Sequence, residues 1–187
     1  MPLNLPNLIT LLRILLIPLI VGVYYLPDEV LSPSGQNIAA TAVFIVAAIT
    51  DWLDGYLART LNQMSAFGAF FDPVADKLVV VGALIVLLKL QRVDIVVALI
   101  IIGREIAISA LREWMARVGQ AKSVAVAFAG KIKTVVQMIA IPMLLYHDDL
   151  LMLPTQWLGT VLINVAAVLT VISMLYYLRR ALPLVRG

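Results

Sequence analysis

Four aspartates lie within residues 51–76 of an otherwise apolar chain, and they form two pairs. Asp51 and Asp54 are three residues apart, and Asp72 and Asp76 are four residues apart. Residues at these spacings lie on one face of a helix, so each pair projects from a single face. An ionisable side chain at the centre of a membrane-spanning helix costs about 2.5–3.5 kcal/mol. The four carboxylates therefore need positively charged partners.

Divalent cations are the partners that the residue types favour. Carboxylates at close range cannot all stay ionised without compensation. Ligand sets made only of oxygen select hard ions such as Mg²⁺ or Mn²⁺. Four carboxylates could hold two metal ions about 3.5–4 Å apart, an arrangement that supports in-line displacement at phosphorus. We therefore predict a site for two divalent cations formed by Asp51, Asp54, Asp72 and Asp76.

Simpler roles exist for each aspartate taken alone. Asp72 precedes Pro73, and Asp-Pro is a good start for a helix, so Asp72 could be an N-cap. Asp51 and Asp54 could pair with Arg59 or serve in a proton relay. The four residues together, at these spacings, favour the metal site over these alternatives.

The composition indicates the kind of element that carries these residues. Of 187 residues, 63% are hydrophobic and only 13% are charged, whereas soluble domains carry roughly 25% charged residues. The mean hydropathy is +1.02. The chain has no cysteine, which excludes disulfides, thiolate nucleophiles and cysteine-ligated zinc. We predict an all-α integral membrane protein, a single domain over residues 1–187, with six transmembrane helices of about 20 residues each: 7–26, 37–60, 70–90, 94–116, 125–146 and 155–180.

The distribution of charge predicts the orientation of these helices. Lysine and arginine favour the cytoplasmic side of a membrane, so both termini are predicted to be cytoplasmic, with Lys89 and Arg92 as exceptions on the other side. The net charge of +3 then reflects cytoplasmic loops rather than nucleic-acid binding. Because the loop between 37–60 and 70–90 is short, these two helices are predicted to be neighbours. The basic side has Arg59, Arg112–Lys122, Arg179, Arg180 and Arg186, and the acidic side has Asp28, Glu29, Asp148 and Asp149.

The segment 51–76 resembles the signature of the CDP-alcohol phosphotransferase family. It reads D-x2-D-G-x2-A-R-x8-G-x3-D-x3-D without a departure, which adds Gly55, Ala58, Arg59 and Gly68 to the four aspartates. The resemblance implies six membrane helices, a homodimer and a two-metal site at the cytoplasmic membrane surface. It also implies transfer of a phosphatidyl group from a CDP-linked lipid to an alcohol, with release of CMP.

The resemblance also implies roles for individual residues. The last aspartate of the signature, Asp76, would be the general base that takes the proton of the acceptor hydroxyl. The CDP-lipid would lie against the remaining signature positions, which are Asp54, Gly55, Ala58, Arg59 and Gly68.

Three further stretches narrow the expected acceptor. "LPNLITLLRILLIPL", "GREIAISALREWMA" and "GKIKTVVQMIA" resemble bacterial members of the family that convert CDP-diacylglycerol and sn-glycerol 3-phosphate into phosphatidylglycerophosphate. Their location is the cytoplasmic (inner) membrane. The acceptor is a dianion, so its site needs cations, although basic side chains also extend to lipid headgroups. The predicted acceptor-phosphate residues are Thr10, Arg13, Arg112, Lys131 and Lys133.

Other functions fit parts of the pattern. Within the family, the acceptor could instead be inositol phosphate, serine or phosphatidylglycerol. A divalent-cation transporter could also use aspartates in the membrane, but transporters commonly have internal repeats and helices broken near the midplane, and neither is visible here. An intramembrane aspartyl protease would need only two aspartates and no metal.

Overall fold

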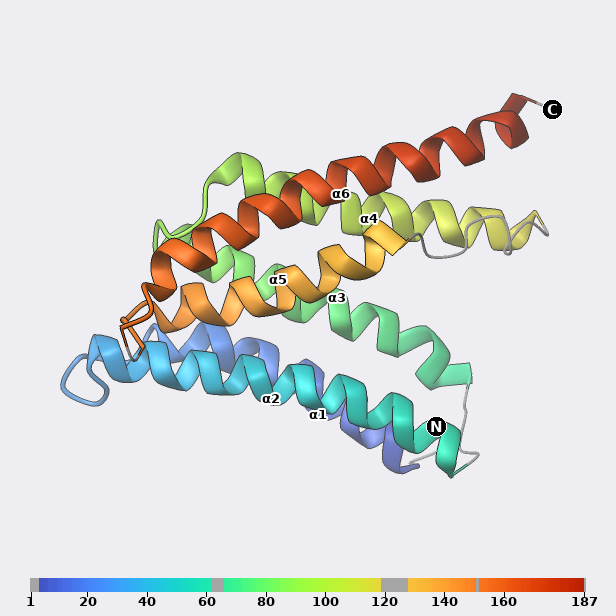
Figure 1. The fold of residues 1–187 in the computed structure, drawn as a ribbon. Coiled ribbons are helices and arrows are strands. Elements are labelled where there is room, and N and C mark those ends of the chain that lie inside the picture. The colour runs from blue at the N-terminus through green and yellow to red at the C-terminus, as the bar shows by residue number, and fades with distance from the viewer. Residues whose placement is uncertain (1–3, 62–65, 119–127, 151, 187) are drawn as a thin grey trace.

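The computed structural model describes residues 4–61, 66–118, 128–150 and 152–186. These residues form helices joined by turns, with an isolated bridge between Leu150 and Leu153 as the only β-type pairing among them. The all-α fold is therefore confirmed, and each helix coincides closely with one predicted stretch (Figure 1). The helices are α1 (Leu5–Val23), α2 (Pro33–Thr60), α3 (Ala66–Lys89), α4 (Ile95–Arg117), α5 (Phe128–Tyr146) and α6 (Thr155–Arg186).

Side-chain caps explain where several helices begin. The Asn4 side chain accepts from the Asn7 amide at the start of α1, and Asp94 accepts from the Val96 amide at 2.7 Å at the start of α4. Ser32 accepts from the Gly35 amide at 3.2 Å, with Pro33 as the first residue of α2. Ser-Pro is a good helix start. This is why α2 begins four residues before the predicted apolar stretch 37–60.

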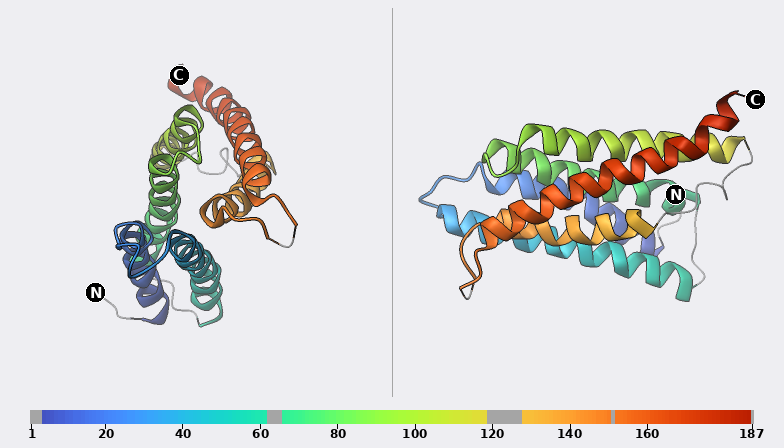
Figure 2. Two further views of the ribbon diagram at one scale, coloured as in Figure 1. Left: turned by 90° about the vertical axis from the view of Figure 1, so that its left-hand side faces the viewer. Right: turned by 45° about the horizontal axis from the view of Figure 1, so that its top comes forward.

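The helix contacts form a closed ring. In order around it, α1 packs on α2, α2 on α5, α5 on α6, α6 on α4, α4 on α3, and α3 on α1 (Figure 2). Helices α2 and α3, which were predicted to be neighbours, touch each other sparsely, as α3 and α4 do, and α1 packs closely against both α2 and α3. Helix α1 begins and α6 ends at the same end of the bundle (Figure 1).

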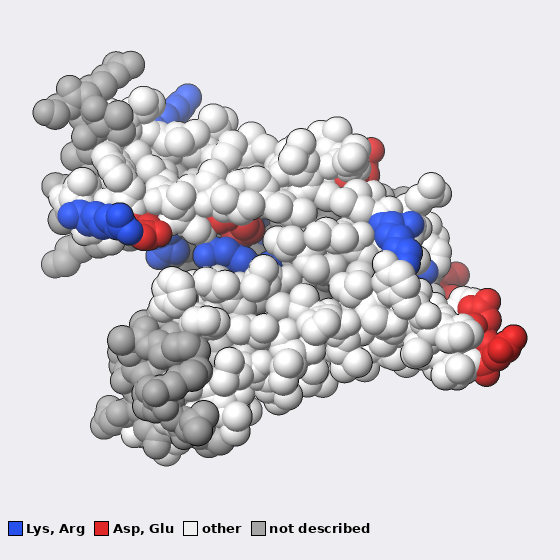
Figure 3. Space-filling view, turned by 180° about the vertical axis from the view of Figure 1, so that it is seen from behind, with Lys and Arg blue, Asp and Glu red and all other residues white. Residues whose placement is uncertain are grey.

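The apolar core lies between the helices, and many large apolar side chains also face outward. Ile20, Phe44, Leu84 and Leu144 are buried, and residues of all six helices contribute to the same core. On the face shown in Figure 3, most of the surface between the two ends is uncharged. Two segments are long and apolar enough to cross a membrane, Pro33–Asp54 and Thr155–Arg179, and the shorter segments Asn7–Val23 and Ile132–Tyr146 are also apolar.

Candidate active site

Three of the predicted aspartates meet at the guanidinium of Arg13. Arg13 Nη1 donates to Asp51 Oδ1 at 3.0 Å and also to Asp76, while Nη2 donates to Asp54. The Arg13 side chain is 1% exposed, so these contacts lie inside the bundle. Carboxylates from α2 and α3 therefore converge on one volume, and a residue of α1 lies at its centre.

The fourth aspartate joins the cluster through Thr10. The Thr10 hydroxyl donates to Asp72 Oδ1 at 2.6 Å and approaches Asp54 Oδ2 at 3.3 Å. Asp72 lies inside α3, and Pro73 follows it within the same helix. The alternative that Asp72 is an N-cap is therefore wrong, because α3 begins six residues earlier, at Ala66.

Helix α1 directs Thr10 and Arg13 towards the aspartates of α2 and α3. Thr10 and Arg13 are three residues apart and share a face, and α1 packs against both α2 and α3. The sequence pattern suggested that these two residues bind acceptor phosphate. The structure places both directly against the aspartates, where Arg13 supplies positive charge to the carboxylates. Their binding of the acceptor phosphate stays a prediction.

The donor atoms of this cluster suit a hard divalent cation. Four carboxylates and a hydroxyl provide oxygen ligands and no nitrogen or sulfur, which is the ligand set that Mg²⁺ and Mn²⁺ prefer. Among the described residues, no group of three or more acidic, histidine or cysteine side chains is arranged closely enough to hold a metal ion. The residue types fit the predicted metals, whereas the spacing of the carboxylates in this arrangement, with the Arg13 guanidinium between them, does not form a closed ligand set.

A second charged cluster joins α4 to α5. Glu105 Oε1 accepts from Lys133 Nζ and from Arg104 Nη1, the latter at 3.2 Å. Arg104 Nη2 also lies 3.5 Å from the Ser173 hydroxyl on α6. Lys133 is buried, and Glu105 is 17% exposed. The predicted acceptor residue Lys133 is therefore held by a carboxylate to which the sequence pattern had assigned no role.

Two adjoining cavities connect this cluster to the aspartates. The smaller, of about 120 Å³, is lined by Asp51, Asp76, Glu105 and Lys133. The larger, of about 580 Å³, is lined by Asp76, Glu105 and Arg112, among others. Figure 3 shows charged side chains along a hollow near the middle of one face, with uncharged surface on either side of it. Arg112 and Lys133 are thus brought to cavities that Asp76 also lines.

Several further polar residues in these walls were missed by the sequence reasoning, among them Lys77, Thr134 and Gln137. Lys77 and Thr134 line both cavities, and Gln137 lines the smaller one. Lys77 directly follows Asp76, and Gln137 lies one turn after Lys133 on the same face of α5. These spacings were a signal that could have identified Lys77 and Gln137.

Five predicted site residues remain to be located. Gly68 is buried in the first turn of α3. The backbones of the other four belong to α2 and α5, but their side chains and surroundings lie outside the described part of the structure. These four are Gly55, Ala58, Arg59 and Lys131.

Comparison with known proteins identifies the family. The model of the CDP-alcohol phosphatidyltransferase family matches residues 3–173. The chain is 48% identical over 183 residues to proteins from Escherichia coli (strain K12) and Shigella flexneri serotype 5b (strain 8401), which covers 97% of this chain and 96% of each relative. Both relatives are named CDP-diacylglycerol–glycerol-3-phosphate 3-phosphatidyltransferase. The chain therefore belongs to the CDP-alcohol phosphatidyltransferase family, as the motif over residues 51–76 had indicated.

Proposed function

We propose that this protein transfers the phosphatidyl group of CDP-diacylglycerol to sn-glycerol 3-phosphate, giving phosphatidylglycerophosphate and CMP. The observation that carries the proposal is the 48% identity, over nearly the whole chain, to relatives whose name states these two substrates. The geometry supports it, because Asp76 lines cavities that also contain Arg112 and Lys133.

Asp76 is the proposed general base. Its carboxylate would accept the proton of the 1-hydroxyl of glycerol 3-phosphate as that oxygen forms a bond to the phosphorus on the lipid side. The bond from this phosphorus to CMP breaks in the same displacement. Arg112 and Lys133 would balance the charge of the acceptor phosphate, and their place beside Asp76 would bring the hydroxyl within reach of the base.

The signature residues, Asp76 included, are proposed to bind metal and nucleotide. Asp51, Asp54, Asp72 and Asp76 would hold two divalent cations, Mg²⁺ or Mn²⁺. When bound, such ions offset charge on the phosphoryl oxygens and the leaving group. Asp54 also belongs to the proposed CDP-lipid site, whose other members are Gly55, Ala58, Arg59 and Gly68.

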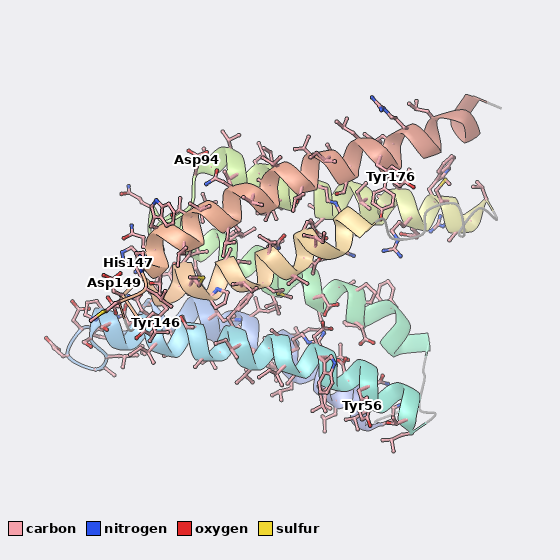
Figure 4. All side chains as sticks on the ribbon, viewed as in Figure 1. Tyr56, Asp94, Tyr146, His147, Asp149 and Tyr176 are labelled. Atoms are coloured by element: carbon pink, nitrogen blue, oxygen red, sulfur yellow. The ribbon has the colours of Figure 1, made fainter. Side chains whose placement is uncertain are left out.

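The membrane arrangement is part of the proposal. All six helices would span the bacterial inner membrane as one domain, with both termini and the aspartates towards the cytoplasm, and the protein would form a homodimer. In support, α1 begins and α6 ends at the same end of the bundle (Figure 1). Tyr56 lies towards that end and Tyr146 lies at the opposite end (Figure 4), which suits the interfacial preference of tyrosine.

One assay tests the reaction and its acceptor. Purified protein is given CDP-diacylglycerol and Mg²⁺ with glycerol 3-phosphate, inositol phosphate, serine or phosphatidylglycerol in separate reactions, and CMP release is measured. We expect CMP release with glycerol 3-phosphate and its loss when EDTA removes the metal. Faster release with another acceptor would overturn the acceptor assignment. Ion transport into vesicles without any CDP-lipid would instead support the transporter alternative.

A further inference from the structure

At the proposed acceptor site, helices α4 and α5 are joined by an ion pair between Glu105 and Lys133. Among the described residues, the backbones of α4 and α5 do not approach each other, although both pack against α3 and α6. Within that part of the chain, the ion pair between Glu105 of α4 and Lys133 of α5 is the one salt bridge that joins the two helices. The position of the Lys133 ammonium therefore depends on Glu105 rather than on close packing of the two helices.

Lys133 has other carboxylates within the same cavity. Its side chain is 2% exposed, and a buried ammonium is strongly destabilised without an anionic partner. Asp51 and Asp76 line the same cavity of about 120 Å³ as Glu105 and Lys133. Because the lysine stem is long and flexible, an ammonium released by Glu105 would turn towards these two aspartates.

Glu105 also holds a second cation. It accepts from Arg104 Nη1 at 3.2 Å, and Arg104 Nε is buried without a hydrogen-bond partner. Arg104 lines the larger cavity together with Arg112. Glu105 thus holds Lys133 and Arg104 beside the larger cavity, which Arg112 also lines. At about 580 Å³, this cavity is large enough for a small anion.

We propose that Glu105 is a positioning residue with two effects. It holds Lys133 and Arg104 where the phosphate of the acceptor binds, and it keeps the Lys133 ammonium away from Asp51 and Asp76. The proposal rests on the proposed function, since it assigns Glu105 a role in that site. Charge, rather than the shape of the side chain, is what the role requires.

The first test compares Glu105→Gln with the wild type in detergent. We expect the KM for glycerol 3-phosphate to rise by about tenfold or more, while the KM for CDP-diacylglycerol stays within about twofold. We also expect Mn²⁺ binding, measured by titration without substrates, to weaken several-fold, because Lys133 would compete for the aspartates. Glu105→Asp, which keeps the charge, should recover part of both losses. Glu29→Gln, on an exposed turn distant from these cavities, is the matched control and should leave both quantities unchanged.

A double variant separates the two effects. In Glu105→Gln/Lys133→Gln the competing ammonium is absent, so Mn²⁺ affinity should return close to the wild-type value, while the KM for glycerol 3-phosphate stays raised. If Glu105→Gln yields no folded protein, the double variant and Glu105→Asp provide the same two measurements.

Specific results would overturn the inference. A purely structural role for Glu105 predicts a lower thermal midpoint with unchanged Mn²⁺ affinity and equal changes in both KM values. Mn²⁺ affinity that stays low in the double variant would also contradict it. Failure of the proposed function is distinguishable, because then the wild type itself would release no CMP with glycerol 3-phosphate.

Discussion

Arg13 is the cation that pairs with most of the carboxylates of this site. It contacts carboxylates that come from two other helices, and it is almost fully buried. Removing one partner of a buried ion network costs more than the network contributes, because the remaining charges are left unpaired. Three of the four aspartates therefore share one protein cation, and the fourth, Asp72, accepts from Thr10.

These ion pairs predict the thermal stability of Arg13→Gln. The loss of the guanidinium leaves the buried Asp54 and the part-exposed Asp51 and Asp76 without their shared cation. The cost should stay below the roughly 3–5 kcal/mol of a fully buried pair, because water screens two of the three carboxylates. We expect a lower thermal midpoint in EDTA and a smaller difference from the wild type when Mg²⁺ is added. Thermal unfolding in detergent, with and without the metal, measures this. An equal loss under both conditions would contradict metal binding at the carboxylates.

The assignment of Asp76 as the base predicts the effect of Asp76→Asn. The amide cannot take up the proton of the acceptor hydroxyl, so kcat should fall by a factor of about 10²–10⁴. The variant should still insert into the membrane and bind CDP-diacylglycerol, which a lipid-binding measurement can verify. Asp94→Asn is the control, because asparagine also caps helices well and Asp94 caps α4 from an exposed position. Wild-type activity in Asp76→Asn would reject the assignment.

The acceptor cations predict a selective change in KM. Arg112→Ala removes a charge that lines the larger cavity, so the KM for glycerol 3-phosphate should rise by about tenfold, and more than the KM for CDP-diacylglycerol. Steady-state kinetics with each substrate varied in turn measures both. Arg117→Ala, whose side chain is exposed and pairs with Glu113, should change neither. A rise confined to the lipid KM would show that Arg112 serves the other substrate.

At the scale of the helices, Arg92 joins elements at the end of the bundle away from the aspartates. Its guanidinium donates to the carbonyl oxygens of Leu144 and Leu145 at the end of α5 and to Asn37 Oδ1 on α2. Carbonyls in the last turn of a helix lack partners within the helix. Arg92 therefore caps α5, which gives it a structural role at an end of the bundle where the proposed orientation would otherwise disfavour a basic residue. Burial lowers the pKa of the nearby His147, and the charge of Arg92 lowers it further.

This capping role predicts a loss of stability without a loss of substrate affinity. Arg92→Gln should lower the unfolding free energy by about 1–3 kcal/mol, because buried carbonyls lose their donors. Lys89→Gln should cost less, since Lys89 is exposed and contacts only the ring of Tyr25 at 3.8 Å among the aromatic residues described. Thermal unfolding in detergent compares the two variants. A change in the KM for glycerol 3-phosphate would contradict a role limited to the fold.

At the scale of the whole molecule, the proposed topology places the two ends of the bundle on opposite sides of the membrane. The end of α4, the start of α1 and the end of α6 lie at one end of the bundle, and the turn between α1 and α2 lies at the other (Figure 1). Arg117 is the last residue of α4, and Glu29 belongs to that turn. Many large side chains between these ends are apolar and outward-facing, such as Leu15 and Leu99. A surface of this kind suits lipid rather than water.

The absence of cysteine makes the topology directly testable. In intact cells, a membrane-impermeant thiol reagent should label Glu29→Cys and should not label Arg117→Cys until the membrane is opened. The cysteine-free wild type is the control for background labelling. Labelling of both variants in intact cells would contradict the proposed orientation.

The sequence alone determined the helices and the family. Each of the six helices lies on a predicted apolar stretch, because a run of apolar residues of that length has few other stable forms in a membrane. The signature over residues 51–76 indicated a family that the comparison then confirmed. Helix ends were less predictable, since caps such as Ser32 extend a helix into polar sequence.

Only the tertiary structure decided which side chains meet. The packing of α1 against both α2 and α3 places Arg13 and Thr10 among the aspartates. The ion pair from Glu105 to Lys133 joins two helices whose described backbones do not approach each other. Periodicity assigns each residue to a face of its own helix. It carries no information on which distant helix that face meets, because that depends on how all six helices pack together.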